Sequence, residues 1–255
     1  MTAALLKVRG LQRRFGGVVA LDGFDVTVAE GTVTALIGPN GAGKTTAFQC
    51  ISGVLRAGAG TVTFDGRDVT GWRPDRVTRA GMVRSFQIAR GIPRLSVMEN
   101  LILYAPVQPG ERVGVALAGR GREAEESARA AAVSVARRLG LLRLGNAPAA
   151  TLSGGQKKLL EIGRALMAKP RMILLDEPVA GVNPSLAEEI AHHLRSLRDE
   201  GMTFLVIEHH MDIVAQLCDP VVVMAEGRVL TEGSFAEVAA DPAVQEAYMG
   251  RRRWN

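Results

Sequence analysis

A glycine-rich segment early in the chain has the residue types needed to hold a polyphosphate. Residues 38–45 read GPNGAGKT, which fits the pattern G-x-x-x-x-G-K-[ST]. Glycines let backbone N–H groups turn toward phosphate oxygens, Lys44 can reach the terminal phosphates, and the Thr45 hydroxyl can ligate Mg²⁺. The residues expected to bind the phosphates are Gly38, Pro39, Asn40, Gly41, Ala42, Gly43, Lys44, Thr45 and Thr46.

Two adjacent carboxylates follow a short apolar run much later in the chain. Met172 to Asp176 reads MILLD, and Glu177 comes next. Because α/β sheets bind their ligands at the carboxyl ends of their strands, we expect this pair near the bound phosphates. Asp176 is suited to hold the Mg²⁺ shell, and Glu177 to polarise a water that attacks the terminal phosphate. A solvated strand end would account for one acid more readily than for a pair.

A second anion site is predicted at Ser153, Gly154, Gly155 and Gln156. These residues precede a helical pattern expected over Lys157 to Ala168. A Ser-Gly-Gly turn at a helix N-terminus exposes backbone N–H groups and the positive end of the helix dipole. An ordinary capped helix would explain the serine and one glycine, but not the position of this segment between the other two motifs.

The elements that must position these residues follow an α/β pattern. Residues 32–37 form a continuous apolar run, as in a strand buried on both faces, and a helix is expected from Lys44. After residue 150, predicted helices and strands alternate, which favours a parallel sheet. A helix is expected over Pro184 to Glu200, with Asn183 as its N-cap and an apolar stripe of Ile190, Leu194 and Leu197.

Antiparallel strands and an inserted helical segment are also predicted. Apolar residues alternate with polar ones around Leu6 and Val26, Asp65-Gly66 is typical of a hairpin turn, and residues 221–233 indicate a last hairpin. Residues 88–150 are different in character, with a helical pattern that ends at Gly140. We expect the apolar stretch Leu101 to Ala105 to form the core of this helical subdomain.

Composition limits the class of protein without selecting its partner. The chain has 255 residues, 47% of them hydrophobic and 22% charged, which is typical of a folded globular protein. A net charge of +5 fits nucleotides, nucleic acid or an anionic membrane surface equally well. The two cysteines, Cys50 and Cys218, indicate neither a disulfide framework nor a metal site. No apolar stretch is long enough to predict a membrane span.

The three motifs, in this order, resemble those of the ATP-binding subunits of ABC transporters, whose signature motif is LSGGQ. The resemblance implies a P-loop NTPase (RecA-like) α/β core with an antiparallel β subdomain and an inserted α-helical subdomain, together forming one ABC ATPase domain. The core and β subdomain would span approximately residues 1–87 and 151–255, and the helical subdomain approximately 88–150, ending at the signature motif.

The resemblance also assigns roles to single residues. Phe15 would stack on adenine, Gln87 would lie at the junction with the helical subdomain, and His209 would be the switch histidine near the γ-phosphate. Glu177, His209 and Lys44 would be catalytic. In the family the signature turn binds ATP held by a partner subunit, which implies two ATP molecules between two head-to-tail subunits. The implied Mg²⁺ ligands are Thr45, Gln87 and Asp176.

Several segments narrow the resemblance to bacterial importers of branched-chain and other hydrophobic amino acids, or of urea and short amides. They are RSFQIARGIPRLSVMENL, DEPVAGVNP, VIEHHM and DPAVQEAYMG; Asn183 stands where many ABC proteins have Asp. The expected partners are a second ABC ATPase, identical or different, transmembrane permeases and, indirectly, a solute-binding protein. A peripheral place on the cytoplasmic face of the membrane follows, with no nucleic-acid partner.

Two other classes are alternatives to an importer. An exporter ATPase, as for lipopolysaccharide, shares the short single-domain build and a similar GV(D/N)P loop. A soluble ABC ATPase that acts on DNA or ribosomes usually has two ATPase units or a long coiled-coil insertion, and this sequence has neither.

Overall fold

The computed structural model of the chain describes residues 3–85, 92–106 and 122–249. Its contacts divide the chain into two compact units. The sheet unit comprises residues 1–84, 171–178 and 194–255, and the helical unit comprises residues 85–170 and 179–193. The predicted phosphate loop and acidic pair lie in the sheet unit, and the predicted signature motif lies in the helical unit.

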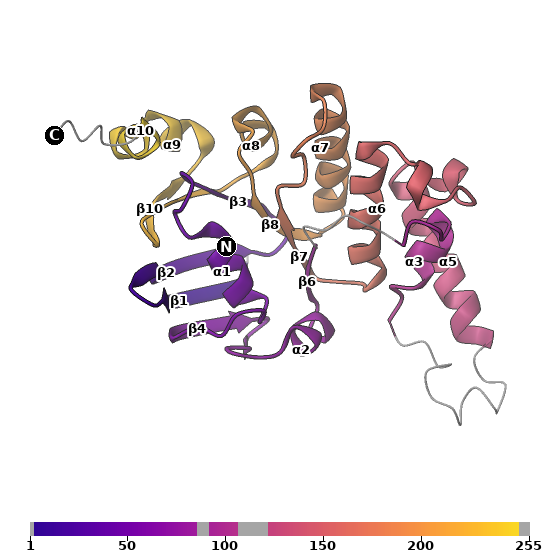
Figure 1. The fold of residues 1–255 in the computed structure, drawn as a ribbon, viewed down its shortest axis with the longest axis horizontal. Coiled ribbons are helices and arrows are strands. Elements are labelled where there is room, and N and C mark those ends of the chain that lie inside the picture. Colours follow the sequence, from indigo (N-terminus) through magenta and orange to yellow (C-terminus); the bar gives the residue numbers. More distant parts are fainter. Residues whose placement is uncertain (1–2, 86–91, 107–121, 250–255) are drawn as a thin grey trace. The chain divides into compact units, whose positions relative to one another are not determined.

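A mixed sheet carries the predicted nucleotide residues (Figure 1). Its strands, in spatial order, are β10 (Arg228–Gly233), β9 (Val221–Ala225), β3 (Val33–Ile37), β8 (Thr203–Ile207), β7 (Met172–Asp176) and β6 (Met82–Arg84). All neighbours pair in parallel except β10 and β9, which form the predicted hairpin. Every residue of β3, β7 and β8 is buried, which explains their continuous apolar sequences.

An antiparallel sheet forms the other layer of the sheet unit. Its order is β2 (Val18–Ala29), β1 (Ala4–Phe15), β4 (Ala59–Phe64) and β5 (Arg67–Asp68). Asp65 and Gly66 join β4 to β5 with φ values of 50° and 72°. Two successive positive φ angles are those of a type I′ turn, so the predicted Asp-Gly hairpin is confirmed.

Helix α1 (Lys44–Ile51) packs into a core shared by the two sheets. Phe48 and Ile51 of α1 are almost fully buried, together with Phe24 from the antiparallel sheet and Leu174 from the mixed sheet. Burying each such side chain contributes about 1.5–3 kcal/mol. This core therefore fixes the first residue of α1, Lys44, at the edge of the mixed sheet.

Helix α7 (Pro184–Asp199) begins in the helical unit and ends in the sheet unit. The Asn183 side chain accepts a hydrogen bond from the Leu186 N–H at 2.9 Å, so the predicted N-cap is confirmed. The predicted apolar stripe is also confirmed, since Ile190, Leu194 and Leu197 are all buried. The remaining helices of the sheet unit are α2 (Pro74–Arg79), α8 (Met211–Leu217), α9 (Phe235–Ala240) and α10 (Pro242–Met249).

The helical unit is built on α3 (Val97–Ile102), α5 (Arg122–Arg138) and α6 (Gly154–Met167), which pack together in Figure 1, with short 3₁₀ turns η2 (Leu142–Leu144) and η3 (Ala149–Thr151). A Cβ atom on Gly163 would lie 2.9 Å from a Leu101 side-chain atom and 3.1 Å from one of Leu139. Glycine at this position therefore lets α6 approach its neighbours closely.

The predicted core stretch Leu101 to Ala105 was mostly wrong. Leu101 is fully buried, but Leu103 and Tyr104 are 51% and 40% exposed. Helix α3 ends at Ile102, and its capping box at Ser96 and Glu99 sets the helical face that buries Val97 and Leu101 one turn apart. Beyond the helix end, the apolar side chains no longer follow that face.

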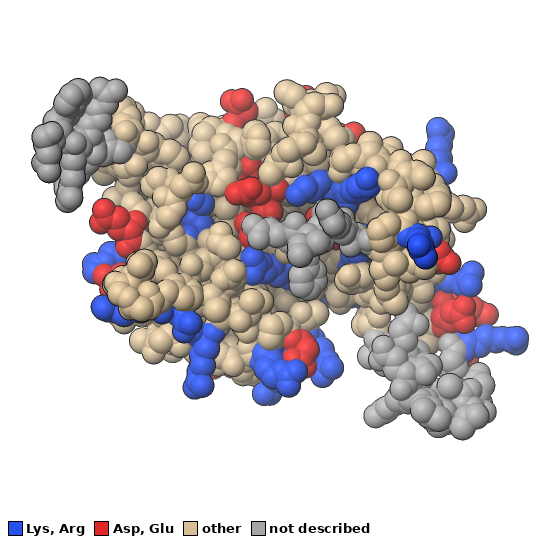
Figure 2. All heavy atoms as spheres, in the orientation of Figure 1, with Lys and Arg blue, Asp and Glu red and all other residues tan. Residues whose placement is uncertain are grey.

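Charged side chains are dispersed over the described surface. On the face in Figure 2, Lys and Arg stand in small groups with Asp and Glu between them. The described side chains on this face therefore form no single basic field. Among the described residues, no helix is both long enough and apolar enough to cross a bilayer.

Candidate functional site

The predicted phosphate loop joins β3 to α1 and requires glycine at its tightest points. Gly38, Gly41 and Gly43 have φ values of 145°, 82° and 103°. A Cβ atom on Gly38 would lie 2.1 Å from the carbonyl oxygen of Met224, and one on Gly43 would lie 2.4 Å from that of Ala20. The loop is thus held against β9 and β2 at distances that only glycine permits.

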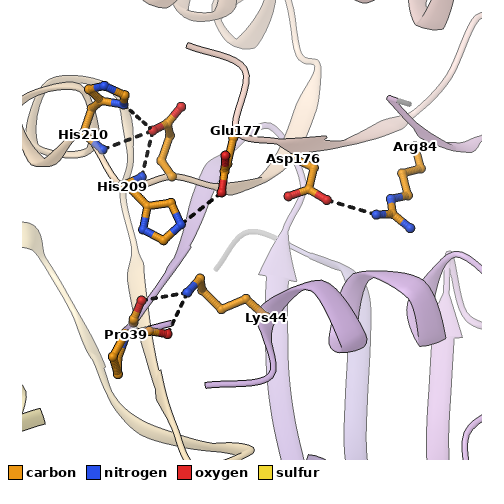
Figure 3. Close-up of polar contacts among 9 residues, drawn as sticks. Pro39, Lys44, Arg84, Asp176, Glu177, His209 and His210 are labelled. Atoms are coloured by element: carbon orange, nitrogen blue, oxygen red, sulfur yellow. Dashed lines mark hydrogen bonds and ion pairs between the residues drawn. The ribbon is translucent and has the colours of Figure 1, made fainter. Parts of the chain in front are cut away.

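Lys44, the first residue of α1, extends along this loop (Figure 3). Its Nζ donates hydrogen bonds to the carbonyl oxygens of Gly38 at 2.7 Å and Pro39 at 3.0 Å. Burial lowers the pKa of Lys44, while the charges of Glu177 and Asp176 act in the opposite direction. The ammonium group therefore lies within electrostatic reach of both predicted carboxylates.

Glu177 and His209 face each other across the ends of β7 and β8 (Figure 3). The Glu177 Oε1 atom lies 3.1 Å from His209 Nε2, and both side chains are about two-fifths exposed, at 41% and 38%. Glu177 has a φ of 53°, and its N–H donates to the Ile207 carbonyl at 2.9 Å. A non-glycine residue in this region costs about 1–3 kcal/mol, which the surrounding structure must offset.

A buried acid that the sequence analysis overlooked, Glu208, organises the turn after β8. Its side chain is 1% exposed, and its Oε2 accepts hydrogen bonds from the backbone N–H groups of His209 at 2.8 Å and His210 at 3.1 Å. His210 Nδ1 lies 3.1 Å from the same oxygen. The His210 ring is therefore held by Glu208, for which an acid directly after a buried strand was the available sequence signal.

Asp176, the last residue of β7, is paired with an arginine that the sequence analysis also overlooked. Arg84 Nη2 donates to Asp176 Oδ2 at 3.0 Å, and the two side chains are 14% and 1% exposed (Figure 3). Arg84 ends β6, the strand next to β7. The sequence signal was an arginine that closes a short apolar strand.

Phe15 ends β1 and presents an accessible aromatic ring. Its side chain is 44% exposed, and it pairs across the hairpin with Val18, which is 67% exposed. The Arg13 guanidinium lies 4.8 Å from the centre of the Phe15 ring. This arrangement is a cation–π contact, which restrains the ring.

The predicted signature residues open α6, which begins at Gly154, three residues earlier than predicted. The physical reason is a capping box: Ser153 Oγ accepts from the Gln156 N–H at 3.3 Å, and Gln156 Oε1 accepts from the Ser153 N–H at 2.9 Å. A Cβ atom on Gly155 would lie 2.1 Å from Leu186, whereas one on Gly154 would meet no described atom within 4 Å. Packing within the chain thus explains Gly155 but not Gly154.

The structure gathers Lys44, Asp176, Glu177 and His209 at one edge of the mixed sheet. Thr45 and Thr46 lie in the first turn of α1, and Phe15 lies at the tip of the antiparallel sheet. Gln87 lies outside the described residues. The arrangement offers a cation, two carboxylates and a histidine around a loop shaped for an anion, which suits phosphoryl chemistry.

Comparisons with known families agree with this chemistry. A family model described as "ABC transporter" matches residues 21–180, and one described as "Branched-chain amino acid ATP-binding cassette transporter" matches residues 228–253. A solved nucleotide-free ATP-binding cassette from an ABC transporter is 38% identical, with a TM-score of 0.86, over 98% of this chain and 100% of that one. A cassette in its ADP conformation gives 38% and 0.85 over the same shares.

Curated relatives extend over nearly the whole chain. The probable branched-chain amino acid transport ATP-binding protein LivG of Methanocaldococcus jannaschii is 40% identical over 98% of both chains. That of Archaeoglobus fulgidus is 39% identical over 96% of this chain and 95% of its own. The high-affinity protein BraF of Pseudomonas aeruginosa is 35% identical over 98% and 99%. The chain belongs to the ABC transporter family, as one of its ATP-hydrolysing cassettes with a P-loop NTPase fold.

Proposed function

We propose that this cassette powers a membrane importer of branched-chain or other hydrophobic amino acids. One observation carries the choice of solute class. Relatives named for branched-chain amino acid transport align with 96–98% of the chain, and the family model over residues 228–253 carries the same description. The geometry of the site supports the ATPase half of the proposal independently of those names.

The polyphosphate of ATP would lie along residues 38–46. Lys44 would then exchange the carbonyl oxygens of Gly38 and Pro39 for phosphate oxygens, which are stronger partners for an ammonium group. Glu177 is accessible enough to accept a proton from water, and His209 Nε2 lies beside it to hold the carboxylate in position. The bond between the β- and γ-phosphates would break as that water attacks in line.

The residues near the loop fit a magnesium ion. Thr45 is an exposed residue with a hydroxyl in the first turn of α1, and Asp176 adds a carboxylate at the end of β7. Hard oxygen donors of this kind suit Mg²⁺. When bound, Mg²⁺ would neutralise charge on the phosphate oxygens. Gln87 remains a predicted ligand outside the described residues.

Adenine would stack on the exposed face of Phe15. The contact of that ring with the Arg13 guanidinium supports this role because a ring held in one orientation loses less freedom when a base stacks on it. Stacking of this kind gives affinity for a purine without strong discrimination between bases. ATP is therefore the expected nucleotide on family grounds, and the stack alone would not exclude GTP.

A second cassette would complete the site. Gly154 at the start of α6 is not explained by packing within the chain, and the exposed N-terminus of α6 with Ser153 suits phosphate. We propose that Ser153, Gly154, Gly155 and Gln156 contact ATP held by a partner cassette, which is either a second copy or a related chain. ATP binding would bring the two together, and hydrolysis would let them separate.

Permease subunits would receive this motion, with the helical unit as the coupling part. That unit comprises residues 85–170 and 179–193 and contains the predicted signature motif. The expected location is the cytoplasmic face of the membrane, and a solute-binding protein on the other side would supply the amino acid. Membrane attachment would come from the permeases.

The proposal is tested by purifying the protein from its native membrane in mild detergent and identifying the associated subunits by mass spectrometry. Two permeases, a second cassette and a solute-binding protein for hydrophobic amino acids are expected. The purified assembly is then placed in liposomes, where ATP-dependent leucine uptake is expected. Recovery with lipid-export components, or with ribosomes, would overturn the importer assignment and leave the ATPase chemistry standing.

A further inference from the structure

The ion pair between Arg84 and Asp176 is the contact of this site that the proposed ATPase chemistry leaves unused. Arg84 lies beside Leu174 in the register of β6 and β7, so its side chain reaches forward along the strand to the carboxylate. The two groups meet at 3.0 Å and are nearly buried. Because the pair is nearly buried, solvent screens its charges less than those of an exposed surface pair.

Asp176 needs a cation before any metal arrives. Its side chain is 1% exposed, and a buried carboxylate is costly unless it is paired. Lys44 contributes charge nearby, but its ammonium hydrogen-bonds Gly38 and Pro39. Of the residues that the structure describes, Arg84 alone donates a hydrogen bond to Asp176. Arg84 therefore holds this carboxylate in a fixed orientation.

The two carboxylate oxygens of Asp176 have different surroundings. Oδ2 accepts the hydrogen bond from Arg84, whereas Oδ1 accepts none from the described residues. Oδ1 is also absent from the fully buried, unpartnered polar atoms of the described chain, so solvent or a ligand can reach it. One oxygen is thus held by the protein, and the other is available to a metal-bound water.

We propose that Arg84 is a positioning residue that sets the magnesium affinity of the site by competing for the charge of Asp176. The proposal rests on the proposed role of Asp176 in holding Mg²⁺. The guanidinium of Arg84 lies 3.0 Å from this carboxylate, so it repels a divalent cation that approaches the same group and reduces the affinity for that cation. Arg84 therefore lowers the metal affinity of Asp176 and also holds its carboxylate in a fixed orientation.

The test measures metal binding without turnover. The protein is saturated with ADP and titrated with Mn²⁺, and free Mn²⁺ is read by electron paramagnetic resonance. Arg84→Gln, which keeps a hydrogen-bond donor and removes the charge, is expected to bind Mn²⁺ about tenfold more tightly than the unchanged protein. Arg79→Gln removes the same charge from an 80% exposed side chain and is expected to change nothing. Equal or weaker Mn²⁺ binding by Arg84→Gln would overturn the proposal.

Two further variants separate the possible failures. Asp176→Asn is expected to weaken Mn²⁺ binding; if it does not, the magnesium role of Asp176 is wrong, whatever Arg84 does. If Asp176→Asn weakens binding and Arg84→Gln leaves it unchanged, only the competition is wrong. Should Arg84→Gln not fold, Arg84→Met decides: it removes the charge with an unbranched side chain, is expected to bind Mn²⁺ about tenfold more tightly, and unchanged affinity would reject the proposal.

Discussion

His209 Nε2 lies 3.1 Å from Glu177 Oε1, at the ends of two neighbouring parallel strands. The pair is held from both sides. The backbone of Glu177 is fixed in a left-handed conformation by its hydrogen bond to Ile207, and the backbone N–H of His209 is fixed by Glu208. The backbone of each residue is therefore fixed, and the ion pair between the two side chains joins them at the edge of the mixed sheet.

Glu177→Gln is expected to lower ATP turnover by about 100-fold or more, because the amide cannot accept a proton from the attacking water. ATP binding should persist, so the variant should accumulate as an ATP-bound dimer in size-exclusion chromatography. Glu189→Gln, at an exposed carboxylate on α7, is the matched control and should retain normal turnover. A Glu177→Gln protein that hydrolyses ATP at the normal rate and stays monomeric would contradict the assigned role.

His209→Ala and His210→Ala should differ sharply in kcat for ATP hydrolysis, although the two residues are adjacent. His209 contacts Glu177, so its loss is expected to reduce kcat by about 100-fold. The His210 ring contacts the buried Glu208, so its loss should cost about 1 kcal/mol of stability and change kcat little. Steady-state ATPase assays and thermal unfolding of both variants make the comparison. Equal losses of kcat would mean that the turn as a whole, and not the imidazole of His209, supports hydrolysis.

Adding a side chain at Gly155 is expected to lower stability, whereas adding one at Gly154 is expected to lower ATP turnover. Gly155→Ala would place a Cβ atom 2.1 Å from the side chain of Leu186, so it should destabilise the fold by about 1–3 kcal/mol. A Cβ atom at Gly154 would meet no described atom within 4 Å, so the melting temperature of Gly154→Val should stay close to normal while ATP turnover falls by about tenfold or more. Thermal unfolding and ATPase assays measure both. Normal turnover in Gly154→Val would argue against a partner nucleotide at this turn.

The buried strands of the site and the loop between β3 and α1 could be predicted because their signals are local. The apolar run that becomes β3, the glycines that follow it and the start of α1 at Lys44 are contiguous in sequence. The same holds for β7 and the two acids at its end. A buried strand followed directly by chemically active residues can be recognised from neighbouring positions alone, without knowledge of distant contacts.

The short helices and the charge pairs could not be predicted, because their signals are not local in the sequence. Helices α2, α3, α8 and α9 have six or seven residues, which is too short for a clear periodic pattern, and tertiary packing stabilises them. Arg84 and Asp176 are 92 positions apart, and only the placement of β6 next to β7 brings them together. The start of α6 was placed too late because glycines disfavour helix, whereas the capping box at Ser153 outweighs that preference.

Cys218 is expected to resist alkylation in the folded protein and to report on the turn after β8. Burial, and to a lesser degree the charge of Glu208, raise its pKa to about 12. At pH 8 only about one thiol in ten thousand would then be ionised, against about one in ten for an ordinary thiol with a pKa of 9. Iodoacetamide labelling, measured by mass spectrometry, should be slower by about a thousandfold than in urea.

The pH dependence of Cys218 follows from the same shift. Because its folded pKa lies above the unfolded value, the stability gained by keeping the thiol neutral is complete below pH 9 and is lost as the pH rises toward 12.

The labelling experiment needs two further variants. Burial also raises the pKa of Cys50, so Cys50→Ala is used to isolate the signal of Cys218. Since Glu208 also holds His209 and His210, Glu208→Gln should open this turn and speed labelling at pH 8. Labelling that is fast in the unchanged protein would show that Cys218 is not enclosed beside this turn.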